Sequence, residues 1–484
     1  MRARGRLPWF LALDQGGHST RAQVFTADGE LLAQARAAVA TAMPHPGWVE
    51  QDAIELAQSL TDVIDDIARQ LGRRTEHIRA AGLATQRSNV VCWDRASGTP
   101  LTPVLSWQDR RNARWLETLA AQAESVRART GLPLSPHYGA SKLRWCLDHV
   151  DAVVRARHGG WLACGPLASY LIARLIPGGP CLVDPANASR TLLWSLGSGN
   201  WDPELLRLFG IARDWLPDCV PTRHAYGMMA IGTHAVPLSV VTGDQAAALY
   251  GDGRPESAQV HVNLGTGAFL QRPLKRLPDA ADGLLRGPVY CDATRCDYVV
   301  EGTVNGAGVA LDWARDELGL TDIERRLPRW LQREGEIPVF LNGIAGLGSP
   351  WWIGHFPSRF VGAGEPWAQG VAVAESIVFM LWENLARMRR LQPGIDAIRI
   401  SGGLAVLDGL CQRLADLSGL PVLRCVEREA TLRGVAFLLA QASGEIWNRS
   451  CSERFEPTSN ATLQRRWQRW QEAMRGAISG AHGQ

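Results

Sequence analysis

Asp14 lies where a short apolar run meets a turn of small residues, an arrangement suited to phosphate chemistry. The run 9–13 alternates its side chains like a strand, and Gly16 and Gly17 follow the acid. Glycines let backbone amides point at an anion with no Cβ in the way, and the hydroxyls at 19 and 20 add donors. A carboxylate here could hold Mg²⁺ or its waters beside a nucleoside triphosphate. The alternative is an ordinary β-hairpin with a glycine turn.

A second acid, Asp244, follows the strand pattern at 238–241 and opens a helix of small residues beside Gln245. An acid in this place would lie at the mouth of a sheet and at the start of a helix. Stabilising the first helical turn as an N-cap is the simpler role, and it is compatible with a chemical one.

The first glycine turn has two counterparts further along the chain. Residues 258–270 predict a strand, a Gly265-Thr266-Gly267 turn and a second strand, and Gly402 and Gly403 follow the strand pattern 398–401. One such turn is weak evidence. Three of them, each after a strand, favour a nucleotide cleft between two similar α/β halves that arose by internal duplication.

The elements that must hold these residues follow an α/β pattern. Asp52 is the predicted N-cap of a helix with a buried stripe from Leu60 to Leu71, and Glu55 completes a capping box. The strand pattern 78–84 then delivers polar residues 85–88 at its carboxyl end, where α/β proteins place ligands.

Two further segments are interpreted as parts of one pocket wall. The cluster 106–111, SWQDRR, puts an aromatic residue beside dense polar groups, and 138–147 predicts a helix. A helix predicted at 460–475 carries Trp467 and Trp470. We expect these tryptophans to pack on the second domain rather than to contact nucleic acid.

Composition narrows the classes of function. A net charge of +3, from 51 basic and 48 acidic residues, predicts no strong attraction to nucleic acid or to an anionic membrane. An early acid interrupts the N-terminal apolar residues, and no run reaches transmembrane length. We therefore predict a cytoplasmic protein with no membrane or nucleic-acid partner. The oligomeric state stays open, a homodimer included.

The charged and sulfur-containing residues limit the available chemistry. Lysine occurs only at positions 142 and 275, and no G-x-x-x-x-G-K-[ST] loop is present. A bound phosphate must then be met by arginine, backbone amides and a metal ion. The ten cysteines show no zinc spacing, even at the closest pair, Cys291 and Cys296. We expect free thiols in a reducing compartment.

Ten motifs, in their order along nearly the whole chain, resemble those of the FGGY carbohydrate kinases and are most similar to the glycerol kinases within that family. They are DQG with Arg21 downstream, GWVEQD, TQR, WQDRR, NASRT, GDQAA, LGTGAF, EGTVNGAG, AGLGSPWW, and SGG with a later ATLRGVA. The resemblance implies two α/β domains of the ribonuclease H-like, actin-like ATPase type, facing each other across a cleft. Residues 1–246 would form the acceptor side and 247–484 the nucleotide side.

The same resemblance implies an ATP-dependent phosphotransferase that uses Mg²⁺ and moves the γ-phosphate to a hydroxyl of a small polyol or sugar. Asp244 would be the general base for the acceptor hydroxyl, and Asp14 and Asp244 would hold the metal. The acceptor pocket would be lined by Arg87, Ser88, Trp107, His137, Asp244, Gln245 and Phe269. The nucleotide would be contacted by Gly16, Gly17, His18, Ser19, Thr20, Arg21, Gly265, Thr266, Gly308, Gly402 and Gly403.

The chain departs from the family in both sites. Ser88 stands where the glycerol kinases have an acid directly after the TQR arginine, and His137 aligns with a tyrosine. Gly17 and His18 replace a pair of threonines, and Leu407 falls at or beside an asparagine that packs on adenine. Losing a carboxylate predicts a more positive, roomier acceptor pocket, and base selectivity stays open.

These departures lead to the hypothesis that the acceptor is not glycerol but a larger polyol, a sugar, or a hydroxy acid whose carboxylate meets Arg87. A glycerol kinase that tolerates Ser88 through a bridging water is the competing interpretation. A catalytically weakened sensor of sugar or nucleotide is a third, opposed by the presence of both Asp14 and Asp244. An actin-like or chaperone-type ATPase would leave the acceptor residues without a role.

Overall fold

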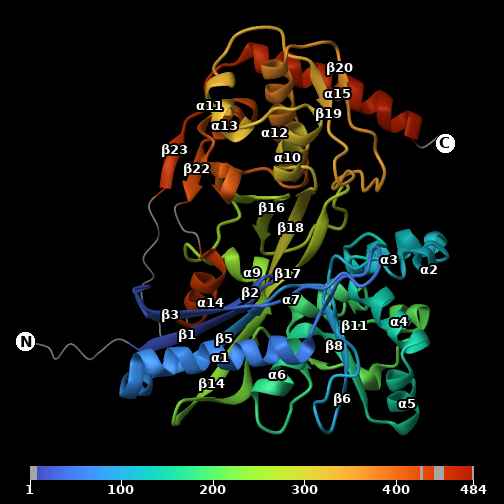
Figure 1. Ribbon diagram of the computed structural model, residues 1–484, viewed down its shortest axis with the longest axis vertical. Helices are drawn as coiled ribbons and strands as arrows, with labels where there is room; N and C mark the ends of the chain where they lie inside the picture. The colour runs from blue at the N-terminus through green and yellow to red at the C-terminus, as the bar shows by residue number, and fades with distance from the viewer. Residues whose placement is uncertain (1–7, 426–428, 441–451, 482–484) are drawn as a thin grey trace, which may run out of the picture. The chain divides into compact units, whose positions relative to one another are not determined.

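The computed structural model describes residues 8–425, 429–440 and 452–481, which fall into two compact units. Unit 1 combines Met1–Pro255, Gly287–Tyr298 and Glu429–Arg449, and unit 2 combines Glu256–Arg286, Val299–Arg428 and Ser450–Gln484. Each unit is a mixed α/β body with a large sheet (Figure 1). The predicted division between residues 246 and 247 assumes two continuous segments and stays a prediction.

Unit 1 is organised around a six-stranded sheet with the order β13-β14-β5-β1-β2-β3. Its strands are β1 (Trp9–Gln15), β2 (Ser19–Thr26), β3 (Leu31–Ala38), β5 (Ile78–Thr85), β13 (Arg223–Ile231) and β14 (His234–Gly243). β1, β2 and β3 pair antiparallel, whereas β1, β5 and β14 run parallel. Gln15 pairs with Thr85, which pairs with Gly243, so these three strands end level at one edge of the sheet.

A smaller sheet, β4-β7-β6-β8, and a set of helices complete unit 1. The strands are β4 (Glu50–Gln51), β6 (Val90–Asp94), β7 (Val104–Leu105) and β8 (Leu162–Pro166), with short pairs formed by β9 (Leu182–Val183), β10 (Trp194–Ser195), β11 (Asn200–Trp201) and β12 (Asp218–Cys219). The helices are α1 (Ala53–Leu71), α2 (Ala113–Glu117), α3 (Ala123–Thr130), α4 (Gly139–His149), α5 (Asp151–Gly159), α6 (Leu167–Leu175), α7 (Pro185–Ala188), α8 (Pro203–Phe209), α9 (Asp244–Ala248) and α14 (Ala430–Ala440).

Helix α1 packs on β2 and β3 with its predicted apolar stripe, Leu60 to Leu71, buried. Asp52 is its N-cap, as predicted, and accepts the amide N–H of Ile54 at 2.7 Å and of Glu55 at 3.3 Å. The predicted capping box is wrong, however. The Glu55 carboxylate accepts the amide N–H of Ala40 at 2.9 Å, because the segment after β3 passes close enough to supply this donor.

Unit 2 repeats the local topology of unit 1 with strands of a seven-stranded sheet ordered β17-β18-β16-β15-β21-β22-β23. Most of β17 and the first residues of β18 lie within Gly287–Tyr298 and therefore belong to unit 1. β15 and β16 form an antiparallel hairpin, and β21 and β22 continue parallel to β15, as β5 and β14 do beside β1. The predicted likeness of the two hairpins is confirmed. The strands are β15 (Gln259–Leu264), β16 (Ala268–Leu274), β17 (Leu285–Cys291), β18 (Cys296–Val304), β21 (Ala397–Ser401), β22 (Val422–Cys425) and β23 (Ser452–Phe455), with β19 (Val339–Leu341) and β20 (Arg359–Val361) as a separate pair.

Helix α12 (Pro366–Leu391) runs through the core of unit 2 and carries a buried acid. The other helices are α10 (Gly308–Glu317), α11 (Ile323–Trp330), α13 (Asp408–Ser418) and α15 (Ala461–Ala481). The Glu375 carboxylate accepts hydrogen bonds from Arg413 at 3.0 Å and from Arg466 at 2.7 Å. Because Arg413 lies on α13 and Arg466 on α15, one carboxylate ties three helices together.

Replacing Glu375 with alanine should lower the free energy of unfolding by about 3 kcal/mol, because two largely buried guanidinium groups lose their shared anion. Urea denaturation of the purified protein measures the change. Asp408→Ala is the matched control: its carboxylate pairs with Arg424 but is 73% exposed, so we expect a loss below about 1 kcal/mol. Equal losses in the two variants would contradict the role given to Glu375.

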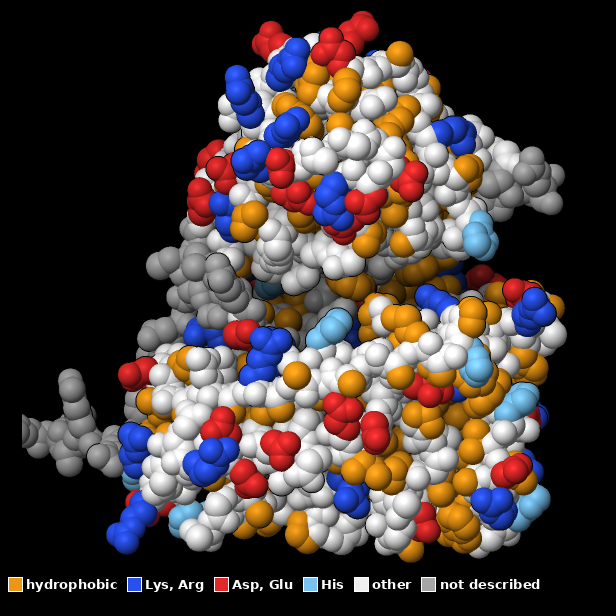
Figure 2. All heavy atoms as spheres, in the orientation of Figure 1, with side chains coloured by type: hydrophobic (Ala, Val, Ile, Leu, Met, Phe, Trp, Pro, Cys, Tyr) orange, Lys and Arg blue, Asp and Glu red, His pale blue; other side chains and the backbone are white. Residues whose placement is uncertain are grey.

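The predicted C-terminal helix is present as α15, and its tryptophans pack within unit 2, as predicted. Trp470 is 1% exposed and donates its indole N–H to the main-chain carbonyl of Phe340 at 3.2 Å. The rings of Trp467 and Trp470 both lie against Phe379. On the face drawn in Figure 2, acidic and basic side chains are interspersed. In the described part of the chain, no helix combines the length and apolar character that a membrane crossing needs.

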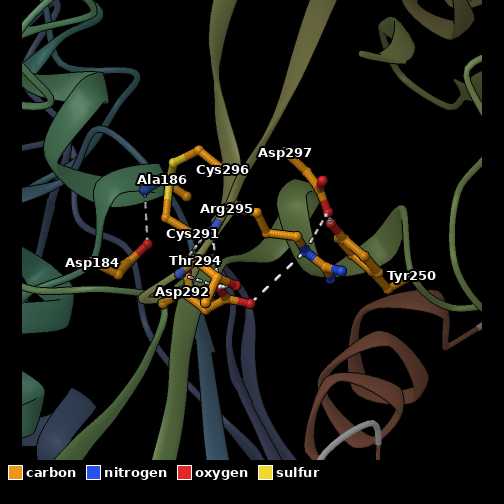
Figure 3. The surroundings of a disulfide bond; sticks show 10 residues. Asp184, Ala186, Tyr250, Cys291, Asp292, Thr294, Arg295, Cys296 and Asp297 are labelled. Carbon is orange, nitrogen blue, oxygen red and sulfur yellow. Dashed lines mark hydrogen bonds and ion pairs between the residues drawn. A yellow bond between two sulfur atoms is a disulfide. The ribbon is translucent and has the colours of Figure 1, made fainter. Parts of the chain in front are cut away.

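The expectation of free thiols is wrong for Cys291 and Cys296, which form a disulfide between the end of β17 and the start of β18 (Figure 3). Asp292 closes the intervening turn by accepting the amide N–H groups of Thr294 at 2.8 Å and Arg295 at 3.0 Å. The spacing of five residues matches no metal motif, and only the hairpin brings the two sulfur atoms together. Seven other cysteines of the described chain are free.

Candidate active site

Asp14, near the end of β1, is a buried acid in which one carboxylate oxygen is hydrogen-bonded and the other is not. Arg21 on β2 binds Oδ2 and also pairs with Glu429, which lies just before α14. Oδ1 is buried and has no hydrogen-bond partner among the described residues. Burial raises the pKa of Asp14 to about 6; the Arg21 charge opposes this rise and Asp244 adds to it.

The unpartnered Oδ1 fits a cation. Among the described residues, no group of three or more His, Cys, Asp or Glu side chains is suited to a metal. Mg²⁺ is commonly held by one or two carboxylates together with phosphate oxygens and waters. The donor set around Asp14 therefore fits Mg²⁺ bound with a nucleotide.

The turn after β1 leaves two amide groups available. The Gly16 N–H donates to the Ser19 carbonyl at 3.1 Å, which closes the turn, and the side-chain amide of Gln51 holds the Gly17 carbonyl at 2.9 Å. Within the described residues, the N–H groups of Gly17 and His18 have no hydrogen-bond acceptor. Two free N–H groups on a fixed turn can bind an anion.

Thr20, predicted to contact phosphate, is placed elsewhere. Its side chain is fully buried, and its hydroxyl is hydrogen-bonded at 2.6 Å to the hydroxyl of Ser59 on α1. Because Thr20 already belongs to β2, strand alternation turns it toward the helix. It is therefore not free to donate to a ligand.

Three glutamine side chains, Gln15, Gln51 and Gln86, support the turn through hydrogen bonds between their amides. Sequence reasoning missed this network. The Gln86 amide donates to the side-chain oxygens of Gln51 at 2.7 Å and of Gln15 at 3.2 Å. Gln15 in turn donates to the Gly16 carbonyl at 2.8 Å. The network links the ends of β1 and β5, so the first turn and the TQR segment are positioned together.

Asp244 lies at the same edge of the sheet, as the first residue of α9. The N-cap is Gly243, so the N-cap interpretation of Asp244 is wrong. One Asp244 oxygen accepts the Gln245 amide N–H at 2.7 Å and lies 3.9 Å from Nε of Arg87. The Arg87 guanidinium also donates to the side-chain oxygen of Gln245. These three predicted acceptor residues thus form one cluster.

Ser88 and Trp107 lie on segments joined by Asn89. Ser88 has a positive φ of 66°, and its buried hydroxyl has no partner in the described structure. The Asn89 side chain accepts the Trp107 amide N–H at 2.8 Å. Trp107 is 37% exposed, and its ring centroid lies 5.5 Å from that of His137. The partly exposed Trp107 ring therefore provides an apolar surface beside His137.

His137 is held neutral by its surroundings. Burial lowers its pKa well below 6.5, and the positive charges of Lys142, Arg110, Arg190 and Arg87 lower the pKa further. A neutral imidazole both donates and accepts a hydrogen bond. Four positively charged side chains therefore act on His137.

The NASRT segment supports the acceptor cluster through Asn187, another residue whose role sequence reasoning missed. Thr85, at the end of β5, donates its hydroxyl proton to the Asn187 side chain at 3.2 Å. Asp184 caps α7 and accepts from the Asn187 side chain at 2.7 Å. Burial raises the pKa of Asp184 to about 6.

In unit 2, the predicted nucleotide residues gather at one end of β15. The Gly308 N–H, at the start of α10, donates to the Gly265 carbonyl at 3.0 Å, and a Cβ on Gly308 would lie 2.8 Å from that oxygen. The Val309 N–H donates to the Thr266 carbonyl at 3.2 Å. Gly402, at a φ of 99°, approaches Leu264 so closely that a Cβ would lie 2.5 Å from its carbonyl oxygen. Only glycine fits at these approaches.

The segment after Gly402 begins as a 3-10 helix, Gly403–Val406, and α13 starts after it, at Asp408. Phe269 lies on β16 opposite Asn263, in unit 2, and its predicted place in the acceptor pocket stays a prediction.

Comparisons with known proteins cover both units. The N-terminal domain model of the FGGY family of carbohydrate kinases matches residues 9–251, and the C-terminal domain model matches residues 260–443. A glycerol kinase of Alkalilimnicola ehrlichii is 37% identical over 96% of this chain and 98% of its own length. A glycerol kinase of Ralstonia nicotianae is 34% identical over 90% of each chain.

Solved structures share the fold at lower identity. Plasmodium falciparum glycerol kinase with ADP has a TM-score of 0.88 at 22% identity, covering 97% of this chain and 98% of its own. A gluconate kinase from Lactobacillus acidophilus has a TM-score of 0.85 at 20% identity, covering 98% of each chain. Such neighbours confirm the predicted actin-like ATPase fold. With two family models that together span most of the residues and relatives above 30% identity over nearly the full length, this chain belongs to the FGGY family of carbohydrate kinases.

Proposed function

We propose that the acceptor hydroxyl binds beside Arg87, Gln245 and Asp244 and that Asp244 removes its proton. As an FGGY carbohydrate kinase, the protein is an ATP-dependent phosphotransferase that acts on a hydroxyl of a polyol or sugar. The observation that carries the proposal is the Asp244 carboxylate, held by the Gln245 N–H at 2.7 Å beside Arg87, at the strand edge that also presents Asp14.

The proposed reaction needs positioning and one proton transfer. Arg87 and Gln245 hold the acceptor hydroxyls so that one oxygen points toward the γ-phosphorus. Asp244 accepts the hydroxyl proton as the oxygen–phosphorus bond forms and ADP leaves. Asp14, together with Asp244, would hold Mg²⁺, which when bound neutralises charge on the transferred phosphoryl group.

The two free amides of the first turn have a matching role in the proposal. The N–H groups of Gly17 and His18 would contact the transferred phosphoryl group, in place of hydroxyl donors. For Ser19, Arg21 and the unit 2 residues Gly265, Thr266, Gly308, Gly402 and Gly403, contact with the nucleotide stays a prediction. Arg21 would also hold Asp14 in place.

We further propose that the preferred acceptor is not glycerol but a larger polyol, a sugar, or a hydroxy acid whose carboxylate meets Arg87. The four positively charged side chains that act on His137 support an acceptor that carries a carboxylate or several hydroxyl oxygens. The unpartnered hydroxyl of Ser88 supports a substrate with an additional polar group, since a buried polar atom is expected to find a partner.

The acceptor is tested by ADP release with ATP and Mg²⁺ against glycerol, four- to six-carbon polyols, ketoses and polyhydroxy acids. We expect kcat/KM for the best acceptor to exceed that for glycerol by at least about tenfold, or about 1.4 kcal/mol. Glycerol as the best acceptor would overturn the acceptor proposal but leave the kinase intact. No stimulation by any acceptor would favour the sensor interpretation.

Three further predictions concern the location of the protein and its partners. A cytoplasmic location, the lack of a nucleic-acid partner and a homodimer as one open state stay predictions. Sedimentation of the purified protein with and without ATP would establish the oligomeric state.

A further inference from the structure

Lys142 is a buried ammonium group that the reaction described above does not use. It lies in the first turn of α4 and is 1% exposed. Its three N–H groups donate to main-chain carbonyls: Ser88 at 2.7 Å, Ser106 at 2.9 Å and His137 at 2.8 Å. An ammonium group has three donors, so all of its hydrogen-bonding capacity is used.

The three carbonyls belong to three separate segments that border the acceptor pocket. Ser88 follows Arg87 after β5, Ser106 directly precedes Trp107 after β7, and His137 precedes α4. These segments contain four of the predicted acceptor residues. A single nitrogen atom therefore fixes their relative positions.

Two features distinguish Lys142 from a buried lysine that only pairs with an acid in the core. First, it forms no ion pair within the described residues, because the nearby acid Asp109 is bound by Arg111 at 2.8 Å. Second, one of its acceptors belongs to Ser88, whose positive φ is unfavourable for a side chain with a Cβ and needs support. Burial lowers the pKa of Lys142 well below 10.5; Asp109 opposes this change, and Arg110 and Arg111 add to it.

We propose that Lys142 is a positioning residue for the acceptor pocket: by holding the carbonyls of Ser88, Ser106 and His137, it sets where the acceptor-binding side chains stand. The proposal rests on the function proposed above, since it assigns those segments to the acceptor. The phosphate-side turn has its own support in Gln51 and Gln86. The loss of Lys142 should therefore change acceptor binding much more than nucleotide binding.

Lys142→Met tests this, because methionine has a similar length and cannot donate. Arg272→Met is the matched control. Arg272 is also a buried cation, 2% exposed, and it donates to main-chain carbonyls at Ser257, Met388, Gln392 and Pro393 in unit 2. Both variants lose a buried charge and its carbonyl contacts, but only one borders the acceptor segments.

The expected result is a change in the KM of the acceptor without a change in the KM of ATP. Lys142→Met should raise the KM of the best acceptor by at least about tenfold while the KM of ATP stays within about twofold. Arg272→Met should lower the melting temperature and leave both KM values within about twofold. An unchanged acceptor KM in Lys142→Met, or an equal rise in Arg272→Met, would overturn the proposal.

A second variant and a second readout cover the other outcomes. If Lys142→Met does not fold, Lys142→Arg replaces it: a planar guanidinium cannot meet the three carbonyls in the same arrangement, so the acceptor KM should rise at least about threefold. If the wild type responds to no acceptor, the proposed function fails, and hydrogen exchange decides on Lys142 alone. We then expect faster exchange in segments 86–90, 105–108 and 134–138, with exchange in β1 and β14 unchanged; no difference would refute the positioning role.

Discussion

Asp244→Asn is expected to lower acceptor-stimulated ATP turnover by about 10²- to 10⁴-fold, the range that a general base contributes. Asparagine keeps the size of the side chain and can still accept the Gln245 N–H, so the first turn of α9 should remain intact. It cannot take the acceptor proton. Isothermal titration of ATP without Mg²⁺ should show an affinity within about twofold of wild type, since Asp244 is not among the residues proposed to contact the nucleotide itself.

Asp202→Asn is the control for that experiment. Asp202 also opens a helix of unit 1, where it caps α8 by accepting the Glu204 N–H at 2.8 Å. Asparagine caps helices about as well, so turnover should stay within about twofold of wild type. Comparable losses in the two variants would point to general damage rather than to a lost base, and wild-type turnover in Asp244→Asn would exclude Asp244 as the base.

Asp14→Asn is expected to reduce turnover by about 10²-fold or more and, at the same time, to stabilise the protein in the absence of ligand. The turnover loss follows because a neutral amide holds Mg²⁺ poorly. The stability gain follows from the raised pKa of Asp14, about 6 in the folded state against 3.8 ordinarily.

The pH dependence of stability follows from protonation of the Asp14 carboxyl. A raised carboxyl pKa means that the folded state binds the proton more tightly, so stability falls as pH rises from about 4 to about 6 and stays lower above it. The shift corresponds to at most about 3 kcal/mol, and Arg21 keeps Glu429 as a partner when Asp14 is replaced. We expect Asp14→Asn to gain about 1–2 kcal/mol at pH 8.

Urea denaturation without metal or nucleotide, at pH 8 and at pH 4, measures this gain. At pH 4 the wild-type carboxyl is mostly protonated in the folded protein, so the difference between the variant and wild type should largely vanish. A variant that is less stable than wild type at pH 8 would show that the Asp14–Arg21 pair outweighs the cost of burial. Glu30→Gln, an exposed acid in the loop between β2 and β3, serves as the control and should change neither property.

Much of the framework could be predicted because local patterns determine it. The apolar runs before Asp14, Thr85 and Asp244 end in polar or glycine-containing segments, and the structure places all three at one edge of the unit 1 sheet. The glycine turns could be predicted for the same reason. Periodicity and turn chemistry act over a few residues, so the sequence displays them directly.

The contacts that complete the site join residues far apart in the sequence, and local patterns could not predict them. Lys142 reaches Ser88 across 54 positions, and Gln86 reaches Gln51 across 35. Arg21 meets Glu429 across 408. No spacing rule connects such pairs, because they meet only through the tertiary fold. The buried hydroxyl of Thr20 could not be predicted for a related reason: strand β2 begins one residue before it, so its hydroxyl faces α1.

Helix α14 belongs to unit 1 but is synthesised long after Pro255, where the first segment of that unit ends. This helix packs on β1, β5 and α9, so closely that Gly434 leaves no room for a Cβ beside Ala247. Its Arg433 also donates to the Gly251 carbonyl at 3.2 Å. A ribosome completes Pro255 about 180 residues before it completes α14, an interval of roughly 10–40 s at ordinary elongation rates. Throughout that interval the nascent first unit lacks the helix that packs on β1 and β5, so this apolar surface stays uncovered until α14 has been made.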